Sequence, residues 1–237
     1  GNCVETEISE LMIDTIKPEI TVSYDNNEPK ETSYFSDNRT MTIVYKERNF
    51  LEKLAVFEVS VDGGETFETK TLSELSSVDG ISATLLSDTE EKTESGKRSD
   101  ARLITYAIEF NGGTSEDTDY VIKPSVSDMG GNKNAEVIYA PGTAAEEAFT
   151  VDKKAPVIDI SYDNNDVRND HYFKDNRKMT ITYTERNFME KALSFEVYKN
   201  QDAVSLEELK GMEGISVKAI EIKDGMDEDK HTYEISF

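Results

Sequence analysis

Residues 18–27 read PEITVSYDNN, and residues 156–165 read PVIDISYDNN. In the first copy a proline precedes three apolar residues at alternate positions, Ile20, Val22 and Tyr24, and the second copy keeps this spacing. A period of two predicts a half-buried β-strand, and a strand tolerates proline at its start, where the missing N–H is not needed. The sequence therefore builds the same strand twice.

The similarity extends well beyond this strand. Residues 11–59 return without a gap at residues 149–197, with 26 identities over 49 positions. Chains that repeat one module are usually arrays, which serve reach, spacing or multivalent contact. We expect a tail at residues 1–10 that ends an upstream repeat, a first repeat at 11–148 and an incomplete second repeat at 149–237.

The first copy contains further signals along its length. Residues 41–45 and 55–61 alternate between apolar and polar positions and predict two more strands, and residues 104–110 predict another. Residues 71–74 place Thr and Glu at the spacing of a capping box, which predicts a short helix, and Ser205 and Glu208 repeat this spacing in the second copy. Residues 87–100 are charged and lack an apolar period, so we expect a surface loop there.

The second copy stops earlier in the module than the first. Copy one continues through two more predicted strands, at residues 119–128 and 135–139, whereas copy two ends at Phe237, which aligns with Phe110. We therefore expect a second module that lacks its last two strands and exposes unpaired strand edges. We expect either the missing strands or residues 3–13 of another chain to occupy that edge.

Two linking motifs complete the pattern. Residues 128–132 read DMGGN at the end of the strand predicted over residues 119–128, and residues 151–156 read VDKKAP before the next copy. With a strand-opening proline and about seven strands per module, the chain resembles the bacterial immunoglobulin-like repeats of surface proteins from Gram-positive gut bacteria. The resemblance implies an all-β fold of tandem immunoglobulin-like β-sandwiches, the second truncated before its last two strands. It also makes Tyr120 a tyrosine corner.

The same resemblance implies a role at the cell surface. Members of the family are non-catalytic extracellular modules that act as stalks, spacers or adhesin modules of larger proteins, with neighbouring repeats of the same polypeptide as partners. The alternative is a binding module that takes a host glycan or a host protein with the loops at one end of each sandwich. Fold alone does not choose between the two.

Composition narrows the class of partner. Acidic residues outnumber basic ones by 49 to 26, for a formal net charge of −23. Such a surface repels nucleic acid and anionic lipid, and no apolar run approaches the roughly 18 residues of a membrane span. The single cysteine, Cys3, cannot form an internal disulfide. The two histidines, His171 and His231, are not repeated and no catalytic motif occurs, so we expect neither an enzyme nor a cofactor.

The loop after the first strand holds candidate metal ligands. Side-chain oxygens on such a loop could bind Ca²⁺, which takes roughly six to eight of them, whereas Asn and Asp also form Asx turns that reverse the chain. We favour turns, because the spacing matches no calcium loop. Asp14 and Asp152, at the module joints, carry the same two interpretations. The candidate ligands are Asp25, Asn27 and Asp37 with their copies Asp163, Asn165 and Asp175.

Two aromatic motifs are kept in both copies. Residues 47–50 read ERNF and return at 185–188, and we expect Phe50 and Phe188 to fill the core, with a recognition loop as the alternative. The other motif could form a platform for a sugar. A chain without tryptophan lacks the preferred stacking residue, so a short edge segment covering the sandwich is the simpler interpretation. This second motif is Tyr34-Phe35 with its copy Tyr172-Phe173.

Overall fold

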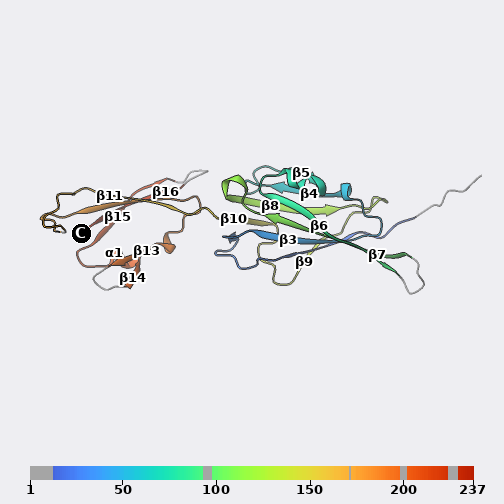
Figure 1. The fold of residues 1–237 in the computed structure, drawn as a ribbon. Coiled ribbons are helices and arrows are strands. Elements are labelled where there is room, and N and C mark those ends of the chain that lie inside the picture. Colours follow the sequence, from blue (N-terminus) through green and yellow to red (C-terminus); the bar gives the residue numbers. More distant parts are fainter. Residues whose placement is uncertain (1–12, 93–97, 171, 198–201, 224–228) are drawn as a thin grey trace, which may run out of the picture. The chain divides into compact units, whose positions relative to one another are not determined.

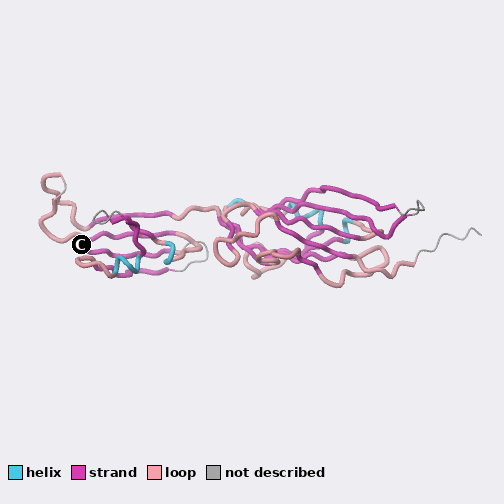
Figure 2. The backbone as a smooth tube through the Cα atoms, turned by 90° about the horizontal axis from the view of Figure 1, so that it is seen from below, coloured by secondary structure: helices cyan, strands magenta, loops and turns pink. Residues whose placement is uncertain are grey.

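The computed structural model describes residues 13–92, 98–170, 172–197, 202–223 and 229–237. The chain divides into two compact units, unit one ending at Lys154 and unit two beginning at Ala155. Both are built from strands, and Figure 2 shows helices only as short turns between them. Within the described residues, no helix is long and apolar enough to span a membrane.

The first sheet of unit one has the order β6-β7-β3-β1-β9. The predicted alternation is confirmed: Ile20 and Val22 are fully buried, and so are Met41, Ile43 and Tyr45. Side chains at every second position of a strand point to the same face, so these residues cover one side of the sheet. The strands are β1 (Glu19–Tyr24), β3 (Arg39–Lys46), β6 (Ile81–Lys92), β7 (Arg98–Phe110) and β9 (Val137–Tyr139).

The second sheet of unit one has the order β2-β10-β8-β4-β5. Strand β8 pairs antiparallel with β4 and β10, and β10 pairs parallel with β2. The two sheets enclose one core and form the predicted immunoglobulin-like sandwich (Figure 1). The strands are β2 (Tyr34–Phe35), β4 (Ala55–Ser60), β5 (Glu68–Thr71), β8 (Asp117–Val126) and β10 (Ala148–Asp152).

The connections hold short helices. Thr71 and Glu74 form the predicted capping box at the start of η2 (Leu72–Ser77). The described part of unit one has two further 3-10 helices, η1 (Glu52–Leu54) and η3 (Gly113–Ser115). The prediction of a loop over residues 87–100 is wrong, because β6 and β7 continue through most of it. Their backbones pair antiparallel and need no buried face for this, since backbone hydrogen bonds alone make the ladder.

Unit two repeats four strands of the first sheet and part of the second. Strands β11 (Val157–Tyr162), β12 (Lys178–Thr184), β15 (Ser216–Lys223) and β16 (Lys230–Ser236) form one sheet in the order β11-β12-β16-β15. Strands β13 (Ser194–Val197) and β14 (Asp202–Ser205) form a second, followed by α1 (Leu206–Lys210) with the predicted Ser205–Glu208 capping box. A 3-10 helix, η4 (Glu190–Ala192), precedes β13.

The boundary between the units differs from the predicted one. A division at 148/149 would cut β10, whose Phe149 and Val151 are buried in the core of unit one. Sequence similarity restarts at residue 149, but pairing partners decide which sandwich a strand joins, and β10 pairs with β8 and β2. In the described part of unit two, no strand holds the position of β8, β9 or β10. The predicted tail, residues 1–10, lies outside the described residues.

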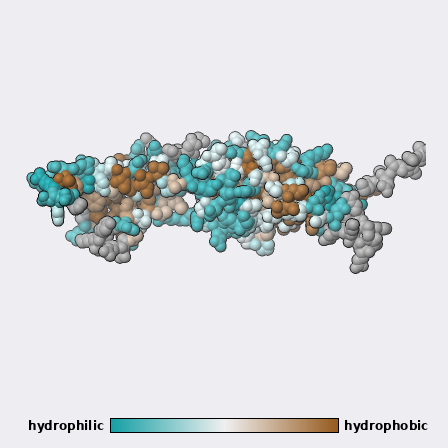
Figure 3. Space-filling model, viewed as in Figure 1, coloured by the Kyte–Doolittle hydropathy of each residue, from teal (hydrophilic) through white to brown (hydrophobic). Residues whose placement is uncertain are grey.

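The apolar face of β11 is open to solvent. Ile158 and Ile160 are 53% and 55% exposed, whereas their counterparts Ile20 and Val22 are fully buried. Figure 3 shows apolar residues at the surface of unit two, where β11 and β16 run. In unit one the second sheet covers the equivalent face, so the exposure follows from the positions that remain unfilled.

Candidate functional site

A buried arginine organises the loop that carries the candidate ligands. Arg39, the first residue of β3, is completely buried, and its guanidinium carbon lies 3.7 Å from the centre of the Tyr24 ring. The rings of Phe35 and Phe149 lie 4.3 Å and 4.6 Å from the same atom. Cation–π contacts of this kind stabilise by about 2 kcal/mol each when they are desolvated. We call these four residues the arginine cage.

Hydrogen bonds satisfy the buried guanidinium. Arg39 Nε donates to the carbonyl of Asn26 at 3.0 Å, Nη1 donates to Ala145 at 2.8 Å, and Nη2 donates to the carbonyl of Ala144 and to Asn27 Oδ1. Burial lowers the pKa of Arg39 to about 10, so the side chain stays charged at neutral pH. The segment before β10 therefore supplies acceptors that water would otherwise provide.

The predicted calcium ligands of unit one take part in these contacts. Asp25 Oδ1 accepts from the backbone N–H of Thr40 at 2.7 Å, and Asn27 Nδ2 donates to the carbonyl of Tyr24 at 2.9 Å. Asn27 Oδ1 also accepts from the N–H of Ala144. Asp37 Oδ2 accepts a long 3.4 Å bond from Ser36. These polar groups close the turn and hold the arginine.

The copies in unit two do the same. Asp163 Oδ1 accepts from the N–H of Lys178 at 2.8 Å, and Asn165 Oδ1 accepts from Arg177 Nη2 at 3.1 Å. Asp175 lines an open cavity beside Arg177. Neither copy of the loop gathers its acidic residues into one group of three within the described residues.

A different acidic group forms elsewhere in unit one. Oxygen atoms of Asp14, Glu47 and Asp128 lie within 4.8 Å of one another. Neighbouring amides already bind all three carboxylates. Asn49 donates from Nδ2 to Asp14 Oδ2 and from its backbone N–H to Glu47 Oε1, both at 2.6 Å, and Asn132 donates to both oxygens of Asp128. Calcium binding by the loop residues, or by Asp14 and Asp152, stays the less favoured of the two interpretations and is not tested by these contacts.

The adjacent aromatics point in opposite directions. Phe35 is 1% exposed and belongs to the arginine cage, so the structure contradicts its role as a ligand contact, whereas Tyr34 is 37% exposed. In unit two, Tyr172 is 71% exposed and Phe173 is half-buried on Arg177, 4.2 Å from ring centre to guanidinium. Alternation along an extended segment explains this division, with each tyrosine outward and each phenylalanine inward.

The residues predicted to be structural are placed as follows. Tyr120 is 1% exposed, and its hydroxyl donates to the carbonyl of Gly80 and accepts from the N–H of Gly112, both at 3.1 Å. Phe50 is buried against the ring of Tyr45. Phe188 is half-buried and stacks on His231, with ring centres 3.9 Å apart. His171 lies outside the described residues.

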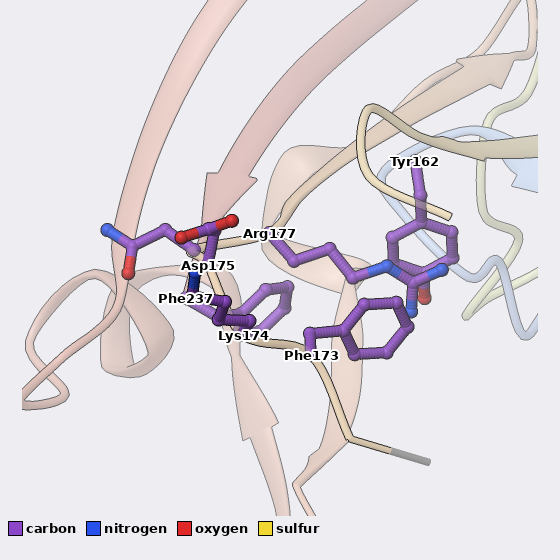
Figure 4. Close-up of a pocket in the computed structure, with 7 residues that line it drawn as sticks. Tyr162, Phe173, Lys174, Asp175, Arg177 and Phe237 are labelled. Atoms are coloured by element: carbon purple, nitrogen blue, oxygen red, sulfur yellow. The ribbon is translucent and has the colours of Figure 1, made fainter. Parts of the chain in front are cut away.

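The cage of unit two is open. Arg177 lies 3.7 Å from the ring centre of Tyr162, and its Nε donates to the carbonyl of Asn164 at 2.7 Å. Figure 4 shows the guanidinium between the rings of Tyr162 and Phe173. Beside it lies a cavity of about 500 Å³. We call this site the open cage, and its lining residues are Tyr162, Phe173, Lys174, Asp175, Asn176, Arg177 and Phe237.

Comparison with known proteins adds little to this description. No family model matches the chain, and no curated protein matches it. Among solved structures, the type II cohesin dyad from the adaptor ScaA scaffoldin of Acetivibrio cellulolyticus is 11% identical, and the match covers 92% of this chain and 77% of that chain. Its TM-score is 0.19, which carries no argument, so the fold assignment stands on the strand pairing described above.

Proposed function

We propose that the chain is a non-catalytic extracellular spacer, a pair of immunoglobulin-like repeats that belongs to a larger bacterial surface protein. One observation carries the proposal. Residues that are identical in the two copies serve the contacts of the fold itself: Arg39 and Asn27 bond each other and the turn, and Arg177 and Asn165 repeat this bond. When the repeated residues serve the stability of the module itself, the module is more typical of a repeat array than of a receptor.

The connection between the units supports the same role. Only residues 153–156 separate β10 from β11. Lys153 is bound to unit one, its N–H donating to the carbonyl of Glu116 at 2.7 Å and its Nζ to Asn38 Oδ1 at 3.1 Å. Pro156 fixes one further backbone angle. A linker of this length allows less variation in the distance between its ends than a long flexible linker does. A spacer requires such a restricted distance.

Small-angle scattering tests the proposal. The chain and a genetic fusion of two copies would be measured side by side. A spacer adds length along one direction, so the maximum dimension of the fusion should be nearly twice that of the single chain. If the modules pack together into a compact body, the maximum dimension of the fusion would increase much less. A fusion whose maximum dimension rises by less than about one third, the expectation for a compact body with chain length, would contradict the spacer role.

A binding module is the second candidate, and the exposed tyrosines favour it. Tyr34 and Tyr172 occupy the same position in the two copies and both face solvent. A glycan array and a panel of host surface proteins would test this, with Tyr34→Ala and Tyr172→Ala as matched variants. A ligand that titrates on the wild-type chain and is lost in these variants would favour binding over spacing.

A further inference from the structure

The side chain of Phe149 packs at the centre of the aromatic core of unit one. Its ring centre lies 5.0 Å from Phe110 and 5.7 Å from both Tyr24 and Tyr120. It also lies 6.1 Å from Phe35, and it closes the arginine cage from the side of β10. Five side chains of unit one therefore surround this one ring.

Four of these five neighbours have a counterpart in unit two, and all four line the open cage. Their register is also kept: Arg39 pairs with Phe110 across β3 and β7, and the N–H of Phe237 donates to the carbonyl of Arg177 at 3.0 Å. The cavity is thus lined by the counterparts of the residues that surround Phe149, and no side chain occupies the position of the Phe149 ring within the described residues of unit two. The four counterparts are Tyr162, Phe173, Arg177 and Phe237.

Polar groups at the open cage match a polypeptide backbone. In unit one, three consecutive carbonyls, at 144–146, accept from Arg39 Nη2, Arg39 Nη1 and the hydroxyl of Tyr24. The corresponding donors, Arg177 Nη1 and the hydroxyl of Tyr162, have no protein acceptor within the described residues of unit two. Three successive carbonyls can face one site because residues 144–147 form a bend, in which Ala145 has a φ of +45°. Donors placed in this way fit a bent polypeptide segment better than an extended strand, whose successive carbonyls alternate in direction.

The surrounding surface extends this match. Ile158, Ile160 and Phe237, the last of which is 49% exposed, offer an apolar face beside the open cage. In its two-stranded sheet, β13 pairs only with β14, so its other edge is unpaired within the described residues. In unit one the equivalent edge, that of β4, pairs with β8 over six positions. An incoming segment would find a strand edge, an apolar floor and the open cage together.

We infer that the open cage of unit two is a docking site for a polypeptide with the chemistry of β8 through β10: one strand that pairs with β13, then a bend that offers three consecutive carbonyls and leads into a second strand that carries a phenylalanine. The carbonyls bind Arg177 and Tyr162, and the phenylalanine enters the cavity. This inference does not rest on the spacer role, because it concerns one face of one unit. Scattering of the fusion and binding of a segment can succeed or fail separately.

A synthetic peptide of residues 117–154 is the probe, added to the full chain. Titration calorimetry would give its affinity, and hydrogen exchange would locate it through protection of the amides of β13. We expect saturable binding. A peptide carrying Phe149→Ala should bind at least tenfold more weakly, because it keeps the strand pairing but leaves the cavity empty.

Variants of the chain provide the matched control. Arg177→Ala should weaken the wild-type peptide at least tenfold, whereas Lys178→Ala, which removes only a surface ion pair with Glu234, should leave its affinity within twofold. The peptide variant keeps the test valid if Arg177→Ala fails to fold.

Three results would overturn the inference. They are no binding of the wild-type peptide, equal binding of both peptides, and protection of β13 that rises with chain concentration without peptide. The last would mean that a second copy of this chain fills the face.

Discussion

Gly80→Ala should destabilise unit one far more than the corresponding Gly214→Ala destabilises unit two. Both glycines have positive φ angles, +76° and +84°, which L side chains rarely adopt. Their surroundings differ. A Cβ on Gly80 would lie 2.1 Å from the Tyr120 hydroxyl and 2.5 Å from the N–H nitrogen of Gly113, whereas a Cβ on Gly214 meets nothing within 4 Å. The pair separates backbone strain from the clash at the tyrosine corner.

The magnitude follows from adding the two effects. A left-handed backbone costs an alanine about 1–2 kcal/mol, and this cost applies at both positions. At Gly80 the displaced Tyr120 also overpacks its site, at about 1–3 kcal/mol, and leaves buried partners unbonded, at about another 1–3 kcal/mol. We therefore expect a loss of about 3–8 kcal/mol in unit one against about 1–2 kcal/mol in unit two.

Urea unfolding followed by hydrogen exchange and mass spectrometry resolves the two units in one sample. Gly80→Ala should lower the unfolding midpoint for peptides of β3 and β8, and Gly214→Ala should cause a smaller shift in β12 and β16. Adding Tyr120→Phe to Gly80→Ala removes the nearest clashing atom, so the double variant should lose less than the sum of the single losses. Equal shifts for both glycines, or strict additivity with Tyr120→Phe, would refute the reasoning.

Three further outcomes are expected. Phe149→Ala should cost unit one about 3–5 kcal/mol in urea unfolding because it empties the centre of the core, and an unchanged midpoint would contradict that placement. Hydrogen bonds from the backbone N–H and then the hydroxyl of Thr114 lower the pKa of Asp79, so this carboxylate stabilises the fold above about pH 4 and loses the effect as pH falls through the lower folded value. Asp79→Asn should therefore flatten the acid limb of the melting curve below about pH 4. Burial raises the pKa of Tyr106 to about 12, so its contribution is complete below about pH 10 and is lost towards pH 12, a loss that Tyr106→Phe should remove.

Much of the strand framework could be predicted from the sequence. Core strands bury one face, so their apolar residues recur at every second position, as Met41, Ile43 and Tyr45 do. This pattern is visible within a few residues of sequence. The capping boxes are equally local, because both partners lie within one turn of helix. These elements follow from rules that act over a few neighbouring residues.

The arginine cage could not be predicted in this way. The sequence directed attention to the correct loop but suggested metal ligands, because arginine is ordinarily a surface residue. Arg39 is buried only because carbonyls and a phenylalanine more than a hundred positions away surround it. The recurrence of Asp-Asn-Arg beside an aromatic pair in both copies was the one available signal. The missed boundary at residue 149 has a similar cause, since the pairing of β10 is set by distant strands.

The parallel pairing of β2 with β10 has a mechanical consequence. A pull on the two ends of unit one drives its first strands and its last strand in opposite directions. Because β2 and β10 run the same way, that pull slides one along the other, and their shared bonds, including the one from the N–H of Thr150 to the carbonyl of Ser33, must break together. A hairpin pulled apart at its open end yields one bond at a time. In unit one, this pair of parallel strands is therefore loaded in shear.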